Sequence, residues 1–383
     1  MEYIKLNELC EINIGKTPSR NNSKYWGDGF YWLSISDMKK NIISETKEQI
    51  TDIAVKESNM KIVPKNTVVM SFKLSIGKTA ILGNDMYTNE AIANFPIKNK
   101  DTLIPEYLIY ALQTLNFNNT DRAVMGATLN KSKLNEIKIP YCNLEIQKKI
   151  VNILNKAQEL INKRKEQIEA LDELVKSKFI EMFGNPVTNS KGWNKEKLNE
   201  LGRLARGKSK HRPRNAPELL GGPYPLVQTG DIANAGIYLK EYTQTYSELG
   251  LKQSKMWDKG TLCITIAANI AKTSILTFDA CFPDSVVAFI PNEKTNTMYI
   301  QFWMSFLQKI LEDSAPESAQ KNINLKILSE QNVIVPPIEL QNEFAAFVQQ
   351  VDKLKFEMEK SLKELEDNFN SLMQRAFKGE LFN

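Results

Sequence analysis

The chain has 383 residues, of which 42% are hydrophobic and 25% charged, so it can form two or three soluble domains with apolar cores. Its net charge of +5 permits nucleic acid as a partner but does not require it. It contains one histidine, His211, so a Ser-His-Asp triad, an HExxH zinc site or a histidine metal triad is hard to build.

The beginning of the chain and its cysteines bear on where the protein resides. Residues 1–16, MEYIKLNELCEINIGK, have acids among the apolar residues, unlike a signal peptide. No apolar run reaches the roughly 18 residues that a membrane-spanning helix needs. The four cysteines, Cys10, Cys142, Cys263 and Cys281, are scattered without a CxxC pair, which predicts neither a disulfide framework nor a zinc site. We therefore expect a cytoplasmic protein without bound metal.

The sequence repeats itself from its beginning. KLNEL at 5–9 recurs at 197–201, and GKT at 15–17 matches GKS at 207–209, both with a shift of 192. A shift of 194 then aligns WLSISDM (32–38) with LVQTGDI (226–232), 64–82 with 258–276, NEAIANF (89–95) with PDSVVAF (283–289), and LEIQ (144–147) with IELQ (338–341). So constant a shift predicts two diverged copies of one unit of about 190 residues, which is too long for a solenoid repeat.

Each copy opens with a predicted α+β domain, residues 1–143 and 184–337. Apolar or alternating runs bounded by Gly, Asn, Asp and Pro predict several short strands in each domain. The runs are FYWLSIS (30–36), NTVVMSF (66–72) and TAILG (79–83) in the first copy, and TLCITIA (261–267), TSILTF (273–278) and SVVAFIP (285–291) in the second. One helical stretch is expected near the end of each domain, at 105–115 and 298–311.

A long helix is predicted after each domain, at 144–183 and 338–378, with a C-terminal tail at 379–383. Apolar residues alternate spacings of four and three over more than four heptads, as in a coiled coil. Prolines precede both helices, and GNP at 184–186 ends the first. The residues expected to pair the helices are Ile150, Leu154, Ile161, Ile168, Leu171, Val175, Phe344, Val351, Met358, Leu365, Phe369 and Leu372.

The polar interruptions of the two heptad patterns fall at different places. Arg164 and Lys178 align with Met358 and Leu372, and Lys355 aligns with Ile161. This difference favours pairing of the two helices with each other, as an intramolecular antiparallel coiled coil; a dimerisation coil between two chains is the alternative. The predicted fold is α+β, with two similar globular domains separated by two long antiparallel helices in a pseudo-two-fold internal repeat.

Residues 202–209, GRLARGKS, match the phosphate-binding pattern G-x-x-x-x-G-K-[ST]. The first copy has Cys10 where the pattern needs its first glycine, so the match occurs in one copy only. A phosphate-binding loop also leads directly into a helix, and Pro213 and Pro217 argue against a helix here. A P-loop nucleotide-binding protein therefore remains only a distant alternative.

Two similar heads on a spacer suit a ligand with two separated half-sites, and DNA is the obvious one, with half-sites repeating every 34–36 Å or so. The loop ARGKSKHRPR at 205–214 holds five cations and no acid, and GKTPSRNNSKYW at 15–26 is its weaker counterpart. Such loops could contact phosphates and reach guanine edges through arginine. His211 lies in this loop, where we expect it to be solvated or to face DNA; a solvated cationic loop with no DNA contact is the alternative.

Amide side chains suited to adenine occur in nearby loops: Gln228, Asn269, Gln320 and Asn322. A set of cationic and polar residues is predicted to bind DNA. The set is Lys16, Arg20, Lys24, Ser34, Lys73, Arg122, Lys131, Arg206, Lys208, Lys210, Arg212, Arg214, Gln228, Asn269, Lys272, Lys321 and Asn322.

In these motifs, taken in order over nearly the whole chain, the sequence resembles the specificity subunits of Type I restriction-modification systems. In the first copy the resemblance rests on LNELCEINIGKTPSR (6–20), YWGDGFYWLSISDM (25–38), SIGKTAIL (75–82), MGATLNKSKLNEIKIP (125–140), LEIQKKIVNIL (144–154) and KSKFIEMFGNP (176–186). In the second it rests on residues 206–232 and on VPPIELQNEF (335–344).

This resemblance implies that each globular domain is a target recognition domain that reads one half of a bipartite, asymmetric DNA sequence. The helices would set the unread spacer and dock two methyltransferase subunits, which methylate adenine, and motor-nuclease subunits would complete the complex. S-adenosylmethionine, ATP and magnesium are expected on those partners, and the specificity subunit itself performs no chemistry. The second copy lacks Thr17–Pro18 and the paired aromatics of the first, Tyr25–Trp26 and Trp32, so the two domains should read different sequences.

Two further alternatives stay open beside the P-loop protein. One is a specificity module that serves a nuclease-methyltransferase fusion of another restriction type. The other is a coiled-coil adaptor with no DNA role, which would show no affinity for duplex DNA.

Overall fold

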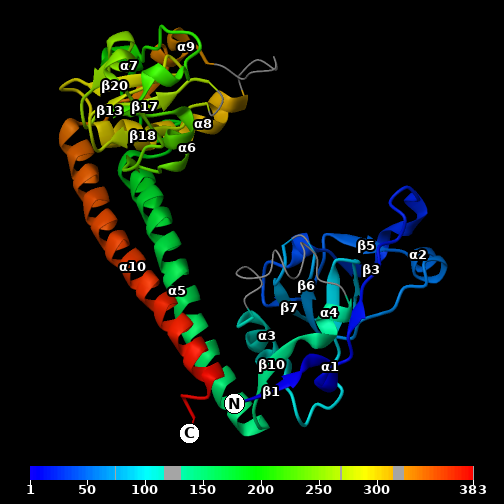
Figure 1. The fold of residues 1–383 in the computed structure, drawn as a ribbon. Helices are drawn as coiled ribbons and strands as arrows, with labels where there is room; N and C mark the ends of the chain where they lie inside the picture. Colours follow the sequence, from blue (N-terminus) through cyan, green and yellow to red (C-terminus); the bar gives the residue numbers. More distant parts are fainter. Residues whose placement is uncertain (74, 116–130, 268–269, 314–322, 383) are drawn as a thin grey trace. The chain divides into compact units, whose positions relative to one another are not determined.

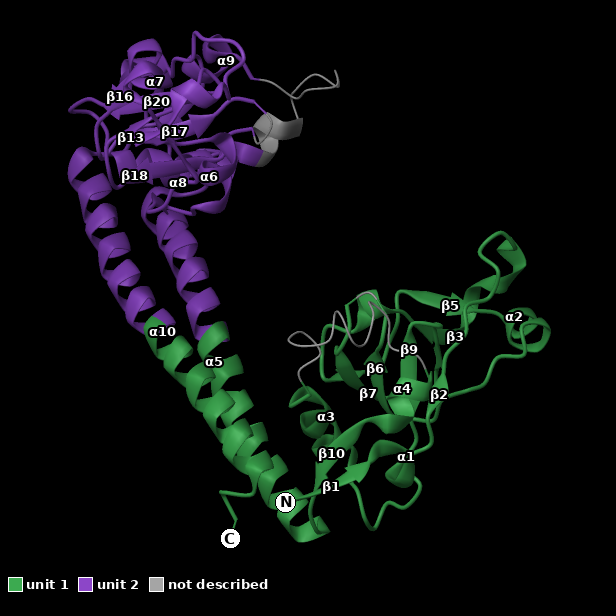
Figure 2. Ribbon diagram, in the orientation of Figure 1, with its two compact units in different colours: residues 1–165, 360–383 green, residues 166–359 purple. Residues whose placement is uncertain are grey.

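The computed structural model describes residues 1–73, 75–115, 131–267, 270–313 and 323–382. The chain divides into two compact units, residues 1–165 with 360–383 (unit 1) and residues 166–359 (unit 2) (Figures 1 and 2). We call residues 1–143 head 1 and residues 184–337 head 2. Each unit contains one head and part of each long helix, α5 (Leu144–Phe183) and α10 (Ile338–Lys378), which occupy the ranges that the heptad patterns predict.

Head 1 is built on a five-stranded sheet, with a three-stranded and a two-stranded sheet beside it (Figure 1). In spatial order the strands are β2 (Asn13–Ile14), β9 (Ile92–Phe95), β6 (Val68–Ser71), β7 (Thr79–Leu82) and β4 (Ile42–Ile43); then β5 (Glu48–Ile50), β3 (Trp26–Leu33) and β8 (Tyr87–Thr88); then β1 (Glu2–Lys5) and β10 (Lys138–Tyr141). The described helices are α1 (Leu6–Leu9), α2 (Asp52–Glu57), α3 (Pro105–Gln113) and α4 (Lys131–Glu136), with 3₁₀ turns η1 (Ser23–Tyr25) and η2 (Ile35–Asp37).

Head 2 repeats this arrangement with its own sequence. Its strands, in the same spatial order, are β12 (Gly202–Arg206), β20 (Val286–Pro291), β17 (Leu262–Thr265), β18 (Thr273–Leu276) and β14 (Tyr238–Leu239); then β15 (Gln244–Tyr246), β13 (Leu220–Leu226), β19 (Ala280–Cys281) and β16 (Met256–Trp257); then β11 (Lys195–Lys197) and β21 (Asn332–Ile334). Its described helices are α6 (Thr229–Asn234), α7 (Glu248–Gln253), α8 (Thr297–Asp313) and α9 (Leu325–Ser329), with 3₁₀ turns η3 (Leu198–Glu200) and η4 (Pro217–Leu219).

The duplication extends to strand register. The pair Trp257–Ala280, which joins β16 to β19 in head 2, corresponds at the shift of 194 to the isolated bridge Val63–Met86 in head 1. The predicted internal repeat is therefore confirmed strand by strand. The short helices α2 and α7, which the sequence analysis did not anticipate, also correspond, and each begins at a hydroxyl cap, Thr51 and Ser247.

The central strand of each five-stranded sheet is buried on both faces, which explains its continuous apolar sequence. In head 1, Val68 and Met70 of β6 pack in the core that includes α3, whereas Val69 faces a second core with Leu33 of β3. Strand β17 of head 2 divides its side chains between two cores in the same way. The sheet is thus a rigid middle layer that carries loops at its ends.

The long helices pack against each other in opposite directions. In unit 1, Ile150 near the start of α5 shares a core with Phe377 near the end of α10. In unit 2, Phe179 near the end of α5 contacts Phe344 near the start of α10, with ring centroids 5.4 Å apart. The antiparallel pairing within one chain, predicted from the heptads, is confirmed.

The residues predicted to pair the helices lie along this contact. Lys355, a polar interruption of the heptads, forms an ion pair of 2.6 Å with Asp172 across the two helices. Of the predicted pairing residues, Ile150, Leu154, Ile161, Leu171, Val175, Phe344 and Val351 are buried, and Ile168, Met358, Leu365, Phe369 and Leu372 are half-buried.

A buried glutamine ties each head to its following helix. Gln147, in the LEIQ motif, donates to the carbonyls of Thr102 and Cys142, both at 2.8 Å, and accepts from the amide of Ile104. Gln341, its counterpart in IELQ, donates to the Pro336 carbonyl at 2.8 Å and to a second carbonyl of head 2. Since both side chains are fully buried, these hydrogen bonds fix the start of each helix against its own head.

Candidate nucleic-acid interface

The GK motifs of the two heads have a structural explanation. A side chain on Gly15 would overlap the backbone carbonyls of Thr88 and Asn89, and one on Gly207 would overlap those of Phe282 and Pro283. The following lysine then donates its backbone N–H to the same strand connection, Lys16 to Thr88 at 2.8 Å and Lys208 to Phe282 at 3.1 Å. The glycine therefore permits close approach of two backbone segments in both heads.

The phosphate-binding interpretation of residues 202–209 does not fit this geometry. Residues 202–206 form strand β12, and the chain continues from 207 to 216 without a helix until the short 3₁₀ turn η4. A P-loop needs a helix N-terminus directly after the lysine. The Lys16 and Lys208 side chains are exposed on the surface of their heads.

The cationic loop of head 2 surrounds an acid that comes from a distant segment. Asp284 forms an ion pair of 2.6 Å with Arg214 and lies 3.9 Å from Arg212, and its carbonyl accepts from Nε of Arg206 at 2.9 Å. Arg212 Nη1 also donates to the carbonyls of Ser209 and His211. The loop has no acid in its own sequence. Three of its five cations are nevertheless held, by one aspartate from another segment and by backbone carbonyls.

The remaining residues of this loop rest on helix α7. The backbone N–H groups of Lys210 and His211 both donate to the side chain of Gln253, at 2.6 and 3.1 Å. We expected His211 to be solvated or to face DNA; it is half-buried, and its Nδ1 lies 3.2 Å from the carbonyl of Pro213. The loop is thus an ordered surface rather than a loose cationic segment.

A basic and aromatic cluster lies beside this loop, and two of its cations escaped the sequence analysis. The Lys255 ammonium lies 3.8 Å from the centre of the Trp257 ring, and the Arg203 guanidinium lies 5.9 Å from it. Desolvation, reinforced by the charges of Arg203 and Lys208, lowers the pKa of Lys255. Arg203 lies in β12, just before the cationic loop, and Lys255 lies after α7, so only the fold brings the two cations together.

Head 1 has a different cationic site on the corresponding loop. The Arg20 guanidinium lies 3.7 Å from the Trp26 ring centre and 4.9 Å from that of Trp32, and donates two hydrogen bonds to Glu48, at 2.5 and 3.0 Å. Trp32 in turn donates its indole N–H to the carbonyl of Lys16 at 3.1 Å. Trp26 and Trp32 therefore form an aromatic platform for one arginine.

Two of the other candidates have capping roles. Ser34 and Gln228 occupy equivalent positions at the starts of η2 and α6, and the backbone N–H of each donates to the aspartate three residues later, Asp37 at 3.0 Å and Asp231 at 2.7 Å. Gln228 also donates to Gln244 at 3.1 Å, so its amide is already engaged within head 2.

The candidate lysines are dispersed. Lys24 and Lys131 are exposed in head 1, and Lys73 is half-buried with its ammonium 5.5 Å from the Phe72 ring. Lys272 lies in head 2 beside a cleft. Four predicted DNA-binding residues, Arg122, Asn269, Lys321 and Asn322, lie outside the described residues, as does Gln320.

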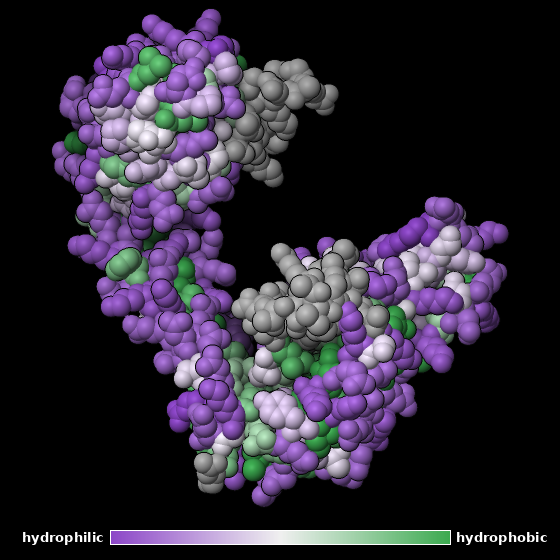
Figure 3. Space-filling view, in the orientation of Figure 1, coloured by the Kyte–Doolittle hydropathy of each residue, from purple (hydrophilic) through white to green (hydrophobic). Residues whose placement is uncertain are grey.

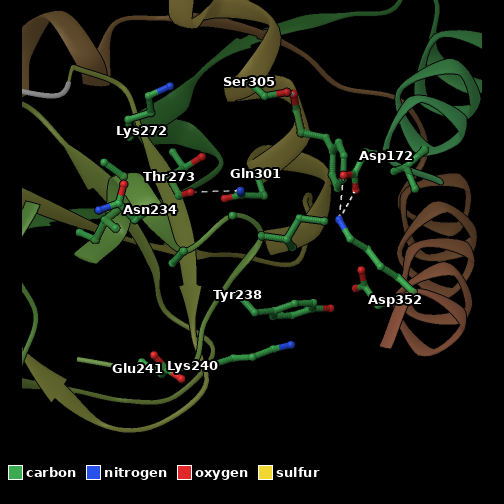
Figure 4. Close-up of a pocket in the computed structure, with 18 of the residues that line it drawn as sticks. Asp172, Asn234, Tyr238, Lys240, Glu241, Lys272, Thr273, Gln301, Ser305 and Asp352 are labelled. Carbon is green, nitrogen blue, oxygen red and sulfur yellow. Dashed lines mark hydrogen bonds and ion pairs between the residues drawn. The ribbon is translucent and has the colours of Figure 1, made fainter. Parts of the chain in front are cut away.

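This cleft, of about 1240 Å³, lies in unit 2 between the edge of head 2 and the two long helices (Figure 4). The Lys355–Asp172 ion pair lies at its helical wall, and Tyr238 extends from β14 toward Asp352 of α10 (Figure 4). Burial raises the pKa of the Asp352 carboxyl, although the hydrogen bond from Tyr238 and the charge of Lys355 act to lower it. The cleft is thus lined by charged and polar side chains of head 2 and of both helices.

Two findings concern other kinds of site. Across the described ranges, no group of three or more His, Cys, Asp and Glu side chains is placed to hold a metal ion. None of the helices described is long and apolar enough to cross a lipid bilayer.

Comparison with known proteins follows the same division into repeats. The sequence profile of the family described as "Type I restriction modification DNA specificity domain" matches residues 1–170 and again 190–367. The MjaIX specificity subunit of Methanocaldococcus jannaschii, a Type I restriction enzyme subunit, is 26% identical to this chain, over 98% of this chain and 92% of its own. The EcoR124I/EcoR124II specificity subunit of Escherichia coli is also 26% identical, over 42% of each chain.

Solved structures show the same fold. A chain from a structure on complex assembly and conformational transition of the type I R-M system superimposes with a TM-score of 0.66 at 18% identity, and the match covers 99% of this chain and 98% of that one. The Type I restriction-modification S subunit from M. genitalium gives a TM-score of 0.53 at 16% identity, covering 98% of this chain and 96% of that one.

Proposed function

The chain belongs to the family of Type I restriction-modification DNA specificity domains, and from this we propose that it selects the DNA target of a Type I restriction-modification complex. The observation that carries the proposal is the duplication: the family profile matches both halves of the chain, and the two heads have the same strand order. Two related heads suit a target made of two separated half-sites. The subunit itself performs no chemistry.

We propose that the two half-sites differ, because the heads carry different side chains on the same scaffold. Head 1 has one arginine on a tryptophan platform, Arg20 on Trp26. Head 2 has a cationic loop and the cluster of Arg203 and Lys255 around Trp257. Arginine can read guanine edges, whereas lysines on an exposed surface mostly contact phosphates. The predicted target is therefore bipartite and asymmetric.

The helices α5 and α10 are proposed to set the unread spacer and to dock the partner subunits. Support comes from large apolar side chains that stay exposed on the helices outside the pairing contact: Leu160 and Leu174 on α5, and Leu354 and Phe356 on α10, each about half exposed. Apolar side chains are visible among the hydrophilic ones along the helices in Figure 3. Such residues favour burial against another protein. Restriction and methylation subunits are the partners, and an internal two-fold repeat favours two methyltransferase subunits.

The cofactors are proposed to bind these partners. S-adenosylmethionine would bind the methyltransferase subunits, and ATP and magnesium the motor-nuclease subunits. In this scheme the chain orients the methyltransferase subunits on the DNA. The buried side chains of Gln147 and Gln341 each fix a head on its helix. A methyltransferase docked on the helices would therefore be held at a defined place on the DNA. We further propose that the complex works in the cytoplasm.

Mapping of methylated adenines tests the proposal. DNA exposed to the full-length chain with its methyltransferase should carry methyl groups in one bipartite motif, with two different half-sites and a constant gap. The control is the methyltransferase alone, which should leave that motif unmodified. Methylation at a single continuous motif, or an unchanged pattern when the chain is omitted, would contradict the proposed function.

A further inference from the structure

In both heads, an arginine of the cationic loop, residues 15–26 in head 1 and 205–214 in head 2, is held by a carboxylate from elsewhere in the same head. Glu48 on β5 takes hydrogen bonds from Nη1 and Nη2 of Arg20. Asp284, in the connection before β20, forms an ion pair of 2.6 Å with Nη2 of Arg214. Neither acid lies within the loop that it contacts, so the folding of each head brings the pair together.

The arrangement recurs across the duplication, although the side chains have diverged. Residue 90 of head 1 corresponds to residue 284 of head 2, and both are acids, Glu90 and Asp284. The hydrogen bonds that Arg20 donates to Glu48 are the main cause that raises the pKa of Arg20, and the charge of Glu90 adds to it. An acid therefore contacts the loop arginine in both heads, although the two acids, Glu48 and Asp284, come from different elements.

The contacts fix each guanidinium without using all of its donors. A guanidinium has five N–H groups, and Glu48 takes two from Arg20 while the Trp26 ring covers one face at 3.7 Å. Arg214 is held at Nη2. Donors therefore remain on both arginines for a base edge, while the carboxylate neutralises the charge that would attract a phosphate.

We propose that Glu48 and Asp284 are positioning residues that hold Arg20 and Arg214 ready to read base edges and keep them from backbone phosphates. The inference rests on the proposed function, since it requires that these heads read DNA. An arginine that is ordered before binding loses less rotamer freedom in the cognate complex. An arginine held on a carboxylate also adds little to sequence-independent binding, which depends on free cations. Both effects raise discrimination between cognate and noncognate DNA.

The side chains of both ion pairs are partly exposed, so DNA can reach them. The side chains of Arg20 and Glu48 are 50% and 44% exposed, and those of Arg214 and Asp284 are 45% and 34% exposed. Ion pairs of this kind add little to folding stability. Their removal should therefore alter DNA binding without unfolding the head.

The test measures binding of the methyltransferase complex, assembled on the full-length chain, to two duplexes. One carries the motif mapped by methylation, and the other has both half-sites permuted. With Glu48→Gln or Asp284→Asn, the freed arginine should gain a phosphate contact on the permuted duplex. For the permuted duplex, the slope of the logarithm of the binding constant against the logarithm of the salt concentration should then become steeper by about 0.9. The ratio of cognate to noncognate affinity should fall by roughly three- to tenfold.

Matched controls separate this effect from a general change of charge. Glu136→Gln and Glu196→Gln remove one acid from exposed lysine pairs, Lys5–Glu136 in head 1 and Lys294–Glu196 in head 2, and should leave the ratio unchanged. The double variants Arg20→Gln/Glu48→Gln and Arg214→Gln/Asp284→Asn should lose the steeper salt dependence, because the freed arginine is absent. Asp284→Glu, which keeps the charge, should restore most of the discrimination.

The possible results distinguish failure of the positioning role from failure of the proposed function. If the wild-type complex discriminates and Glu48→Gln and Asp284→Asn discriminate equally well, with the same salt dependence, the positioning role is wrong and the proposed function stands. If the variants bind the cognate duplex more weakly and their affinity for the permuted duplex is unchanged, the proposal that the acids keep the arginines from backbone phosphates is wrong. If the wild-type complex binds both duplexes alike, the proposed function itself fails.

Discussion

At the scale of single residues, Gly207 and Gly15 are limited by the backbone that faces them. A Cβ atom on Gly207 would overlap two carbonyl oxygens of the β19–β20 connection, which cannot move without disturbing strand pairing. Gly207→Ala should therefore lower the free energy of unfolding by about 1–3 kcal/mol. Urea unfolding of the full-length protein measures this effect.

Gly230→Ala provides the control, because Gly230 lies in α6 with open space around its Cβ position. This variant should be neutral or slightly more stable, since alanine favours helix. Equal stability of the two alanine variants would show that the close approach at Gly207 does not constrain the fold.

Asp352, on the helical wall of the unit 2 cleft, should lower stability at neutral pH. Folding raises its pKa above the usual 3.8, mainly through desolvation, so the folded state binds this proton more tightly than the unfolded chain. The protonated carboxyl therefore contributes favourably to the free energy of unfolding below the pKa of the unfolded chain, and this contribution is lost as pH rises through the pKa of the folded state. Asp352→Asn keeps an acceptor for Tyr238 and should raise the melting temperature of unit 2 at pH 7 by about 1–2 °C.

The pH dependence provides the check on this assignment. The difference in melting temperature between Asp352→Asn and wild type should shrink as pH is lowered and the wild-type carboxyl, whose pKa folding raises, takes up its proton. If the difference in melting temperature stays constant with pH, the effect of the substitution comes from packing rather than from charge.

At the scale of elements, the long helices offer a direct test of the spacer proposal. One heptad inserted into α5 after residue 165, with a matching heptad in α10 before residue 360, keeps the apolar pairing pattern. Seven residues add about 10 Å, the length of roughly three base pairs. The mapped motif should keep both half-sites and gain about three base pairs of gap. An unchanged gap would refute the role of the helices in setting it.

Elements with a repeated pattern were predictable, whereas contacts between distant segments were not. The heptads located α5 and α10, and apolar runs located β6, β7, β17 and β18, because the information lies in consecutive residues. The capping residues Thr51 and Ser247 are signals in the sequence from which the starts of α2 and α7 could have been predicted. The shift of the repeat also predicted the common fold of the two heads.

The candidate interface was predicted only in part, for the same reason. The cationic loop was visible as a run of charges, but its acid, Asp284, and the acid that binds Arg20, Glu48, come from segments that only folding brings close. Arg203 and Lys255 are far apart in the sequence and come together around Trp257 only in the fold. Ser34, one of the predicted DNA-binding residues, belongs to a helix cap, and the DNA role of every candidate stays a prediction.

At the scale of the whole molecule, the tandem repeat and the antiparallel helices have a joint consequence for the target. Each head is followed by one helix, and the two helices pack in opposite directions within each unit. This pattern predicts that the two repeats bind DNA in a pseudo-two-fold relation rather than by translation. Half-sites read by repeats with this relation lie on DNA as inverted elements. The asymmetry of the target then comes only from the divergence of the two heads.

A chain with two identical heads tests this relation. Replacing residues 193–337 by a second copy of residues 1–143 follows the shifts of the repeat and keeps α5, α10 and both helix starts. This chimera should direct methylation to the first half-site and its inverted copy, with the wild-type gap, because the helices are unchanged. The reciprocal chimera should give the second half-site twice. Two copies in the same orientation would contradict the pseudo-two-fold relation, and retention of the asymmetric motif would show that the heads do not carry the sequence preference.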